Sequence, residues 1–182
     1  MKRNKKYLNH FIFLVKLFFP ALLILFILRG FLLIPVRVDG NSMSKTLVQG
    51  DMVLIEKISP IRRFDVIIFK LPNQSIYIKR IIGLPGDTIY YKHDQLYVND
   101  HAVKETFLFN NKREDHALIP YTTNFTLKDL TNRTTIPKKS YFVLGDNRRM
   151  SKDSRSFGTI KSKYIIGKAR CIYYPLHHFK LI

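Results

Sequence analysis

The sequence predicts a mostly-β domain preceded by one N-terminal transmembrane helix. The run FIFLVKLFFPALLILFIL at residues 11–28 is apolar except for Lys16. From residue 31 onward, short segments with alternating apolar and polar residues follow one another, separated by Gly, Pro, Asn and Asp. Several short strands at close spacing, with hardly any helical periodicity after the apolar run, indicate a β-rich sheet or barrel. The 182 residues suffice for one membrane segment and one domain.

The apolar run is predicted to be an uncleaved signal anchor. At about 1.5 Å per residue it would span roughly 27 Å, close to the hydrocarbon thickness of a bilayer. The basic residues 2–6 place the N-terminus in the cytoplasm by the positive-inside rule. A removable signal peptide is the alternative, but the bulky residues after Arg29 offer no Ala-x-Ala-like cleavage site. We therefore expect a single-pass protein of the cell membrane, with a cytoplasmic tail (1–10), an anchor (11–29) and an extracytoplasmic domain (30–182).

The predicted strands follow the anchor. They lie in FLLIPVRVDG, DMVLIEKI, FDVIIFKL, YIKRIIGL, two segments around His93–Asp94, SYFVLGD and IIGKARCIYY. Residues 104–137 are polar, rich in Asn, Thr and Lys, and weakly patterned. The domain is therefore expected to contain a loop-rich insertion at about residues 88–138.

The charge of the chain is strongly positive. The chain carries 31 Lys and Arg against 13 Asp and Glu, a formal net charge of +18, which first suggests a nucleic-acid partner. The basic residues are spread along the chain, however, and no zinc-finger or single-strand RNA motif is present. An anionic membrane or wall surface explains the charge equally well, so we expect a lipid bilayer and no nucleic acid as partner.

Cofactor and metal chemistry have little support in the sequence. Cys171 is the only cysteine, so neither an intrachain disulfide nor a CxxC metal site is available. The six histidines have no metal-ligand spacing, and none stands in a motif that would pair it with a serine. No glycine-rich phosphate loop is present. We expect no metal and no cofactor.

The segment YIKRIIGL raises the question of chemistry. In a strand, Lys79 and Arg80 point to opposite faces, and each face is otherwise mostly apolar. Burial readily lowers the pKa of a lysine, whereas an arginine stays charged. A neutral lysine is a competent general base, and a serine hydroxyl is its usual target when no histidine is available. Ser42, which follows a strand and a Gly40–Asn41 turn, is the best candidate serine.

Three segments resemble a known family. GNSMSKTL at residues 40–47, YIKRIIGLPGD at 77–87 and GDNRRMSKDSRSFG at 145–158 are similar to the three signature boxes of type I signal peptidases. The single basic-flanked anchor resembles the Gram-positive form. The resemblance covers nearly the whole chain and is weakest from about residue 92 to 138. It implies the β-rich Ser-Lys peptidase fold that signal peptidases share with self-cleaving repressors.

The resemblance also implies roles for individual residues. Ser42 matches the nucleophile of the family, Lys79 its general base, and Ser151 the serine that hydrogen-bonds and orients this lysine. Main-chain N–H groups of the nucleophile turn would stabilise the oxyanion, because Gly40 stands where some relatives carry a serine hydroxyl. The residues of this oxyanion and substrate-binding turn are Gly40, Asn41, Ser42 and Met43.

Charged residues around this dyad match polar residues that brace the site in the family. They are Arg80, Asp146, Arg148, Asp153 and Arg155. Asp146 and Asp153 are expected to form structural ion pairs, because each has an arginine two residues further on. The chain departs from the family pattern at Lys45, where proline is usual, and at Phe64, where glycine is usual.

The implied function is that of a membrane-bound serine endopeptidase. It would remove N-terminal signal peptides from exported preproteins through an acyl-enzyme, with small residues at the first and third positions before the cut. One alternative is an inactive membrane-anchored relative that binds signal peptides or the active peptidase. Another is a basic DNA-binding, self-cleaving protein, for which the ten residues ahead of the anchor are too few to form a DNA-binding domain.

Overall fold

The computed structural model divides into two compact units, residues 1–34 and residues 35–182, which are described separately. The structure describes the backbone of residues 2–182 and the side chains of residues 7, 10–26 and 34–182. Met1 of the predicted tail, the side chains of the basic residues 2–6 and that of Arg29 lie outside this description.

The first unit consists of one long helix, α1 (Lys2–Leu32). Its large apolar side chains between Phe11 and Phe26 are exposed. The helix continues past the predicted end of the anchor at residue 29, and the predicted strand from Phe31 begins only at Leu33. After Pro20, which lies inside the helix, the next proline is Pro35, so the helix can extend through residues 30–32. Within the described part of the chain, no helix is both long and apolar enough to cross a membrane.

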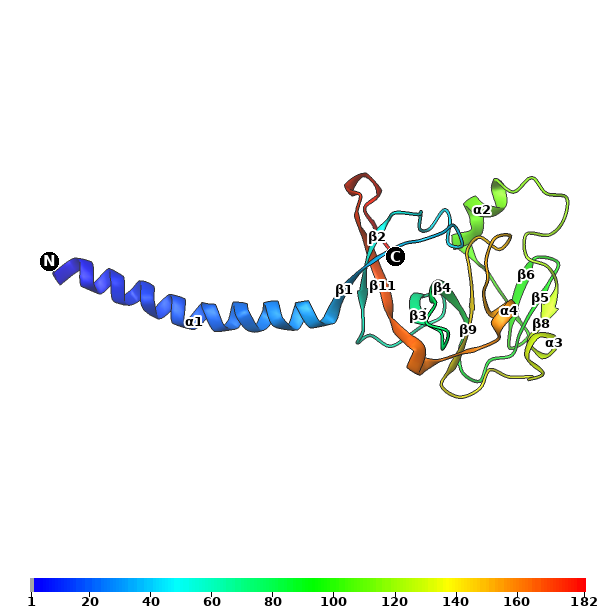
Figure 1. Ribbon diagram of the computed structural model, residues 1–182, viewed down its shortest axis with the longest axis horizontal. Coiled ribbons are helices and arrows are strands. Elements are labelled where there is room, and N and C mark those ends of the chain that lie inside the picture. The colour runs from blue at the N-terminus through cyan, green and yellow to red at the C-terminus, as the bar shows by residue number, and fades with distance from the viewer. Residues whose placement is uncertain (1) are drawn as a thin grey trace. The chain divides into compact units, whose positions relative to one another are not determined.

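The second unit is built on two β-sheets (Figure 1). The larger sheet has the strand order β1-β2-β11-β3-β4-β9-β10, with β12 also paired to β11. The smaller sheet has the order β7-β6-β5-β8. Their bounds are β1 Leu33–Arg37, β2 Met52–Glu56, β3 Val66–Lys70, β4 Ile76–Gly83, β5 Ile89–Lys92, β6 Gln95–Val98, β7 His101–Val103, β8 Phe125–Thr126, β9 Ser140–Leu144, β10 Ile160–Lys161, β11 Ile165–Tyr174 and β12 Lys180–Leu181.

Only short helices join these strands. Three are α-helical, α2 (Phe109–Arg113), α3 (Leu127–Thr131) and α4 (Ser154–Phe157). Three single turns are 3₁₀-helical: η1 (Thr106–Leu108), η2 (Ser162–Tyr164) and η3 (Leu176–His178). The prediction of a β-rich domain is therefore confirmed.

Strand β4 lies between two hydrophobic clusters. On one face, Ile81 belongs to a cluster with Phe69 and Val143. On the other, Ile82 belongs to a cluster with Tyr91 and Phe142, which joins the two sheets. Because apolar side chains cover β4 on both faces, any charged residue in this strand is withdrawn from water.

The two edges of strand β4 are paired over different residues. One edge pairs with β3 from Ile76 to Arg80, whereas the opposite edge pairs with β9 only from Arg80 to Gly83. Residues 76–79 therefore present unpaired backbone groups on the side away from β3, within the described sheet. Such an open edge can accept an additional strand.

The predicted insertion, residues 88–138, contains short strands and helices. Residues 88–138 form the smaller sheet together with η1, α2 and α3, and Figure 1 shows these elements grouped beside β9 and α4. Residues 104–137 contain only the short elements η1, α2, β8 and α3 between loops, and elements this short produce no clear periodicity in the sequence. Local capping compensates for this: Thr126 and Asp129 form a capping box at the start of α3.

Candidate active site

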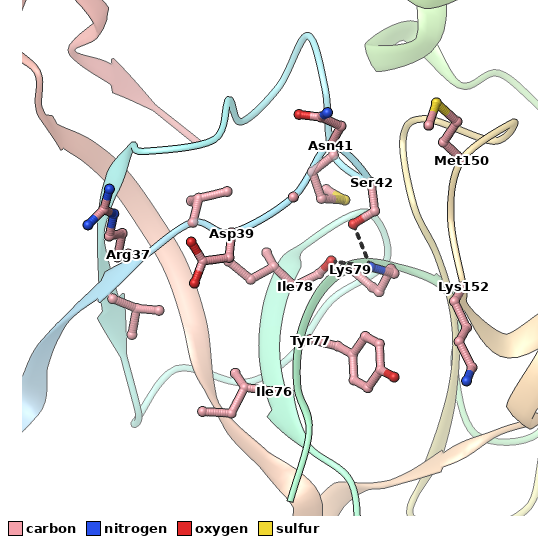
Figure 2. Close-up of a pocket in the computed structure, with 14 residues that line it drawn as sticks. Arg37, Asp39, Asn41, Ser42, Ile76, Tyr77, Ile78, Lys79, Met150 and Lys152 are labelled. Carbon is pink, nitrogen blue, oxygen red and sulfur yellow. Dashed lines mark hydrogen bonds between the residues drawn. The ribbon is translucent and has the colours of Figure 1, made fainter.

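Ser42 and Lys79 lie together, although 37 positions separate them in the sequence. Ser42 belongs to the turn that follows β1, and Lys79 projects from the partly paired half of β4. The Lys79 Nζ atom lies 2.7 Å from Ser42 Oγ and donates a further hydrogen bond of 2.9 Å to the carbonyl oxygen of Ile78 (Figure 2). This distance permits direct proton transfer between the hydroxyl and the amine.

The turn that carries Ser42 is held by its own hydrogen bonds. Asn41 O accepts from Ser44 N at 3.1 Å, and Met43 O accepts from Leu47 N at 2.8 Å. The side chains of Met43 and Leu47 are buried and anchor the turn in the core. Gly40, at φ +82°, supplies a left-handed conformation at the entrance, which costs a residue with a side chain more.

The first two N–H groups of this turn, those of Ser42 and Met43, are available. Among the described residues, none accepts a hydrogen bond from the N–H groups of Ser42 or Met43. A helical turn leaves the N–H groups of its first residues without internal partners. These two groups are therefore free to donate to an oxygen beside Ser42 Oγ.

Burial favours the neutral form of the Lys79 amine. Only 2% of the residue is exposed. Desolvation lowers the pKa of its amine from 10.5 to about 8, although the negative charges of Asp153 and Asp146 act in the opposite direction. A substantial neutral fraction is therefore present at mildly alkaline pH, as a general base requires.

The predicted hydrogen bond between Ser151 and Lys79 is not formed. Its Oγ atom is buried and has no hydrogen-bond partner among the described residues. Lys79 Nζ instead donates to Ser42 Oγ and Ile78 O. Ser151 does lie at the site, because a Cβ atom added to Gly145 would be 2.2 Å from Ser151 Oγ and 2.5 Å from Ser42 O. Gly145 therefore allows these two segments to approach each other.

Asp146 forms its ion pair with Arg80, not with Arg148. Arg80 Nε and Nη2 donate to the two carboxylate oxygens of Asp146 at 2.8 and 2.6 Å, and Thr46 Oγ1 donates at 2.5 Å. Both charged residues are buried. The predicted partner was wrong because Arg80 pairs with Leu144 in the register of β4 and β9, which brings Arg80 next to Asp146.

Arg148 is instead neutralised by the insertion. Its Nη2 atom lies 2.6 Å from Glu105 Oε1, and its Nη1 atom donates to Tyr91 OH at 2.8 Å and to Thr122 Oγ1 at 3.0 Å. The side chain of Arg148 is fully enclosed, and Thr122 and Tyr91 are buried. The insertion therefore supplies the buried counter-ion of an arginine from the third signature segment.

Asp153 and Arg155 form the expected pair. Arg155 Nε and Nη2 donate to the Asp153 carboxylate at 2.9 and 2.8 Å, and Arg155 Nη2 also donates to Arg148 O at 2.9 Å. Asp153 further accepts from Gly145 N at 3.1 Å. Burial raises the pKa of Asp153, but the hydrogen bonds and charge of Arg155, together with the N–H of Gly145, lower it by more, so the net pKa is lowered and the carboxylate stays charged.

The two departures from the family pattern both occupy left-handed backbone positions. Phe64 has φ +71°, a conformation that costs a non-glycine residue about 1–2 kcal/mol and explains the usual glycine. Its ring packs 5.1 Å from that of Phe107, and its carbonyl accepts from Arg80 Nη1 at 2.7 Å. Lys45 has φ +73°, which proline cannot adopt, and its ammonium pairs with Glu114.

A groove of about 410 Å³ runs past Ser42 and Lys79 (Figure 2). The end of β1 and the segment after it form one wall, and the unpaired half of β4 forms the other. β1 is the end strand of the larger sheet, so both walls have an open backbone edge. Its lining residues are Val36, Arg37, Val38, Asp39, Gly40, Asn41, Ser42, Met43, Ile76, Tyr77, Ile78, Lys79, Met150 and Lys152.

Several residues that support the site could not be predicted from the sequence. Asn111 Nδ2 donates to Ser44 O at 3.0 Å and to Asp146 O at 3.3 Å, and Tyr121 OH donates to Asp146 O at 2.9 Å. Like Glu105, these residues belong to the weakly patterned insertion, where nothing in the sequence distinguishes them from surface residues. Asn147 was not predicted either, although it stands inside the third signature segment.

Comparisons with known proteins show the family of the chain. The model of the family described as "Signal peptidase, peptidase S26" matches residues 11–174. A signal peptidase I of Bacillus caldolyticus is 43% identical over 167 residues, covering 88% of this chain and 90% of that protein. Signal peptidase IB of Staphylococcus aureus is 40% identical over 169 residues, covering 88% of this chain and 87% of that protein.

A solved structure is similar as well. The crystal structure of a signal peptidase I from Enterococcus faecalis V583 is 42% identical in sequence and superposes with a TM-score of 0.59. It matches 62% of this chain and 98% of that chain. With a family model that spans most of the sequence and relatives at 40–43% identity, this chain belongs to the signal peptidase family, peptidase S26.

Proposed function

We propose that this protein is a serine endopeptidase that removes N-terminal signal peptides from exported preproteins. The observation that carries the proposal is the 2.7 Å contact between Ser42 Oγ and the buried amine of Lys79. A hydroxyl becomes a strong nucleophile only when a base removes its proton. Lys79 is suited to this task because its pKa is lowered to about 8.

The proposed reaction has two steps. Neutral Lys79 takes the proton of Ser42 Oγ as this oxygen attacks the carbonyl carbon before the cut. The resulting ammonium then donates that proton to the departing amine, which leaves Ser42 acylated by the signal peptide. Lys79 next takes a proton from water, the hydroxide attacks the ester, and the proton returns to Ser42 as the peptide departs.

The oxyanion formed in each step would be stabilised by backbone donors. The N–H groups of Ser42 and Met43 have no partner among the described residues and belong to the turn that carries the attacking oxygen. Each such donor contributes about 3–4 kcal/mol to the stability of the transition state in serine peptidases. Gly40 supplies no hydroxyl, so these backbone groups are the expected donors.

The substrate would bind as an extended strand in the groove. Residues 76–79 of β4 and residues 36–39 have open backbone edges on its two walls. An extended peptide placed between them would hydrogen-bond to both edges, as in β-strand addition. The preference for small residues at the first and third positions before the cut is carried over from the family.

We also propose that α1 anchors the protein in a bilayer, with its N-terminus in the cytoplasm and the peptidase domain outside. The exposed apolar side chains from Phe11 to Phe26 and the basic residues 2–6 support this placement. The turn between β11 and β12 also exposes Leu176 and Phe179, which suits a domain that works beside lipid.

Cleavage of a model preprotein by the full chain in detergent micelles tests the function. Ser42→Ala and Lys79→Ala should each lower the rate by about a thousandfold or more, because each removes a reacting group. Ser44→Ala and Lys70→Ala are matched controls, since neither side chain contacts the dyad. Substantial activity in Ser42→Ala or Lys79→Ala would end the dyad assignment, and binding without turnover by the wild type would favour the inactive relative.

A further inference from the structure

Asn147 contacts the nucleophile turn twice. Its backbone N–H donates to Ser42 O at 3.0 Å, and its side-chain Nδ2 donates to Asn41 O at 3.2 Å. These two carbonyl groups belong to consecutive peptide bonds, one on each side of the Ser42 Cα atom. Asn147 therefore holds two neighbouring peptide planes from the same side.

The orientation of a peptide plane fixes its N–H group as well as its carbonyl. In a trans peptide, the N–H bond points opposite to the C=O bond. The carbonyl of Asn41 shares its peptide bond with the N–H of Ser42, and the carbonyl of Ser42 shares one with the N–H of Met43. When Asn147 holds both carbonyls, both N–H groups must point away from Asn147.

From this geometry we infer that Asn147 is a positioning residue that aligns the Ser42 and Met43 N–H groups for the developing oxyanion. The inference rests on the proposed function, in which Ser42 is the nucleophile. Preorganised donors stabilise an oxyanion only when they already point at its position. At the turn that carries Ser42, Asn147 donates to these two carbonyl groups, so it acts through the orientation of the turn.

Asn147 is itself held in place. Its Oδ1 atom accepts a hydrogen bond from Met150 N at 3.2 Å, which fixes the side-chain amide with Nδ2 facing Asn41. Asn111 adds a third contact to the turn, because its Nδ2 atom donates to Ser44 O at 3.0 Å. The turn therefore depends on amide donors from two other segments, and Asn147 supplies those on either side of Ser42.

Two substitutions separate the roles of the Asn147 side chain. Asn147→Ala removes both the donor to Asn41 O and the acceptor for Met150 N. Asn147→Ser keeps a short acceptor for the local turn but cannot reach Asn41 O. We expect both variants to lose kcat by about tenfold with KM within twofold of wild type, since a misaligned donor costs less than the roughly 100- to 1,000-fold loss of a deleted one.

A transition-state analogue supplies a second measurement. A peptide aldehyde adds to the serine and forms a tetrahedral adduct that carries an oxyanion, so its affinity should fall in parallel with kcat. The pH at which activity is half-maximal should not change, because Lys79 keeps its surroundings. Asn124→Ala is the matched control, since Asn124 Oδ1 also accepts a hydrogen bond between two loops, from His93 N at 2.9 Å, and it should behave as wild type.

Each outcome decides the inference. Wild-type kcat in a folded Asn147→Ala variant, or a rise in KM without a change in kcat, overturns it. Recovery of wild-type kcat in Asn147→Ser also overturns it, because the local turn would then explain the effect. If Ser42→Ala is inactive while both Asn147 variants cleave normally, only this inference fails; if Ser42→Ala cleaves normally, the proposed function fails first.

Discussion

Replacement of Lys79 by methionine should abolish cleavage and at the same time stabilise the fold below pH 8. The buried amine has a pKa of about 8 instead of 10.5. At about 1.4 kcal/mol for each pH unit, burial of the charged form costs roughly 3 kcal/mol. Methionine has a similar length, carries no charge and fills the same apolar surroundings. The substitution also removes two hydrogen bonds, so we expect a net gain of about 1–3 kcal/mol at pH 6.

The pH dependence of this gain follows from proton linkage. Below about pH 8 the amine is protonated in both the native and the unfolded chain, so burial of the charged amine lowers the free energy of unfolding of the wild type by the full amount. Between about pH 8 and 10.5 only the unfolded chain holds this proton, so the stability of the wild type rises with pH. Above pH 10.5 the amine is neutral in both states and the cost has vanished. The advantage of Lys79→Met should therefore shrink from pH 8 to pH 10.

Urea unfolding of the full chain in detergent micelles, followed by tyrosine circular dichroism at pH 6, 8 and 10, measures this difference. Lys70→Met is the matched control, because Lys70 is an exposed lysine at the end of the neighbouring strand β3. It should change the stability little, and by the same amount at each pH. A Lys79→Met variant less stable than wild type at pH 6, or a difference that does not change between pH 6 and 10, would refute the reasoning.

Three further predictions follow from the charged groups. The kcat/KM of the wild type should fall tenfold for each pH unit below about 8 and level off above it, because only neutral Lys79 accepts a proton; an apparent pKa near 10.5 would contradict the buried-lysine assignment. Arg80→Met should lower the free energy of unfolding by about 3–5 kcal/mol, since it leaves the buried carboxylate of Asp146 without its partner; a urea midpoint like that of the wild type would show that the pair is not structural. Glu105→Ala should have a similar effect by leaving Arg148 uncompensated; an unchanged midpoint would mean that the insertion does not support the third signature segment.

The candidate nucleophile and base could be predicted because the evidence for them is local. The alternation in β4 places one cation on each face, and only lysine can lose its proton under burial. The structure shows that both faces are covered, with Lys79 2% and Arg80 7% exposed. The alternation of residues alone could not have predicted this burial. It indicates which side chains share a face of the strand, but not whether other side chains cover that face.

The partners of the charged residues could not be predicted in the same way. Proximity in sequence suggested that Asp146 forms an ion pair with Arg148. The register between β4 and β9 instead places Arg80 beside Asp146. The same reasoning was right for Asp153 and Arg155, because both lie at the start of the short helix α4. Pairing across strands depends on register, which two short segments do not specify by themselves.

The sequence alone determined the β-rich class of the domain, the nucleophile and base candidates and the family, because alternation and short motifs are local properties of the chain. Only the tertiary structure decided that the insertion folds into a second sheet and supplies Glu105, Asn111 and Tyr121 to the site. The reason is physical: a hydrogen bond or ion pair between residues 25–43 positions apart forms only once the sheets have packed, and single Asn, Tyr and Glu residues have no periodicity from which it could be predicted.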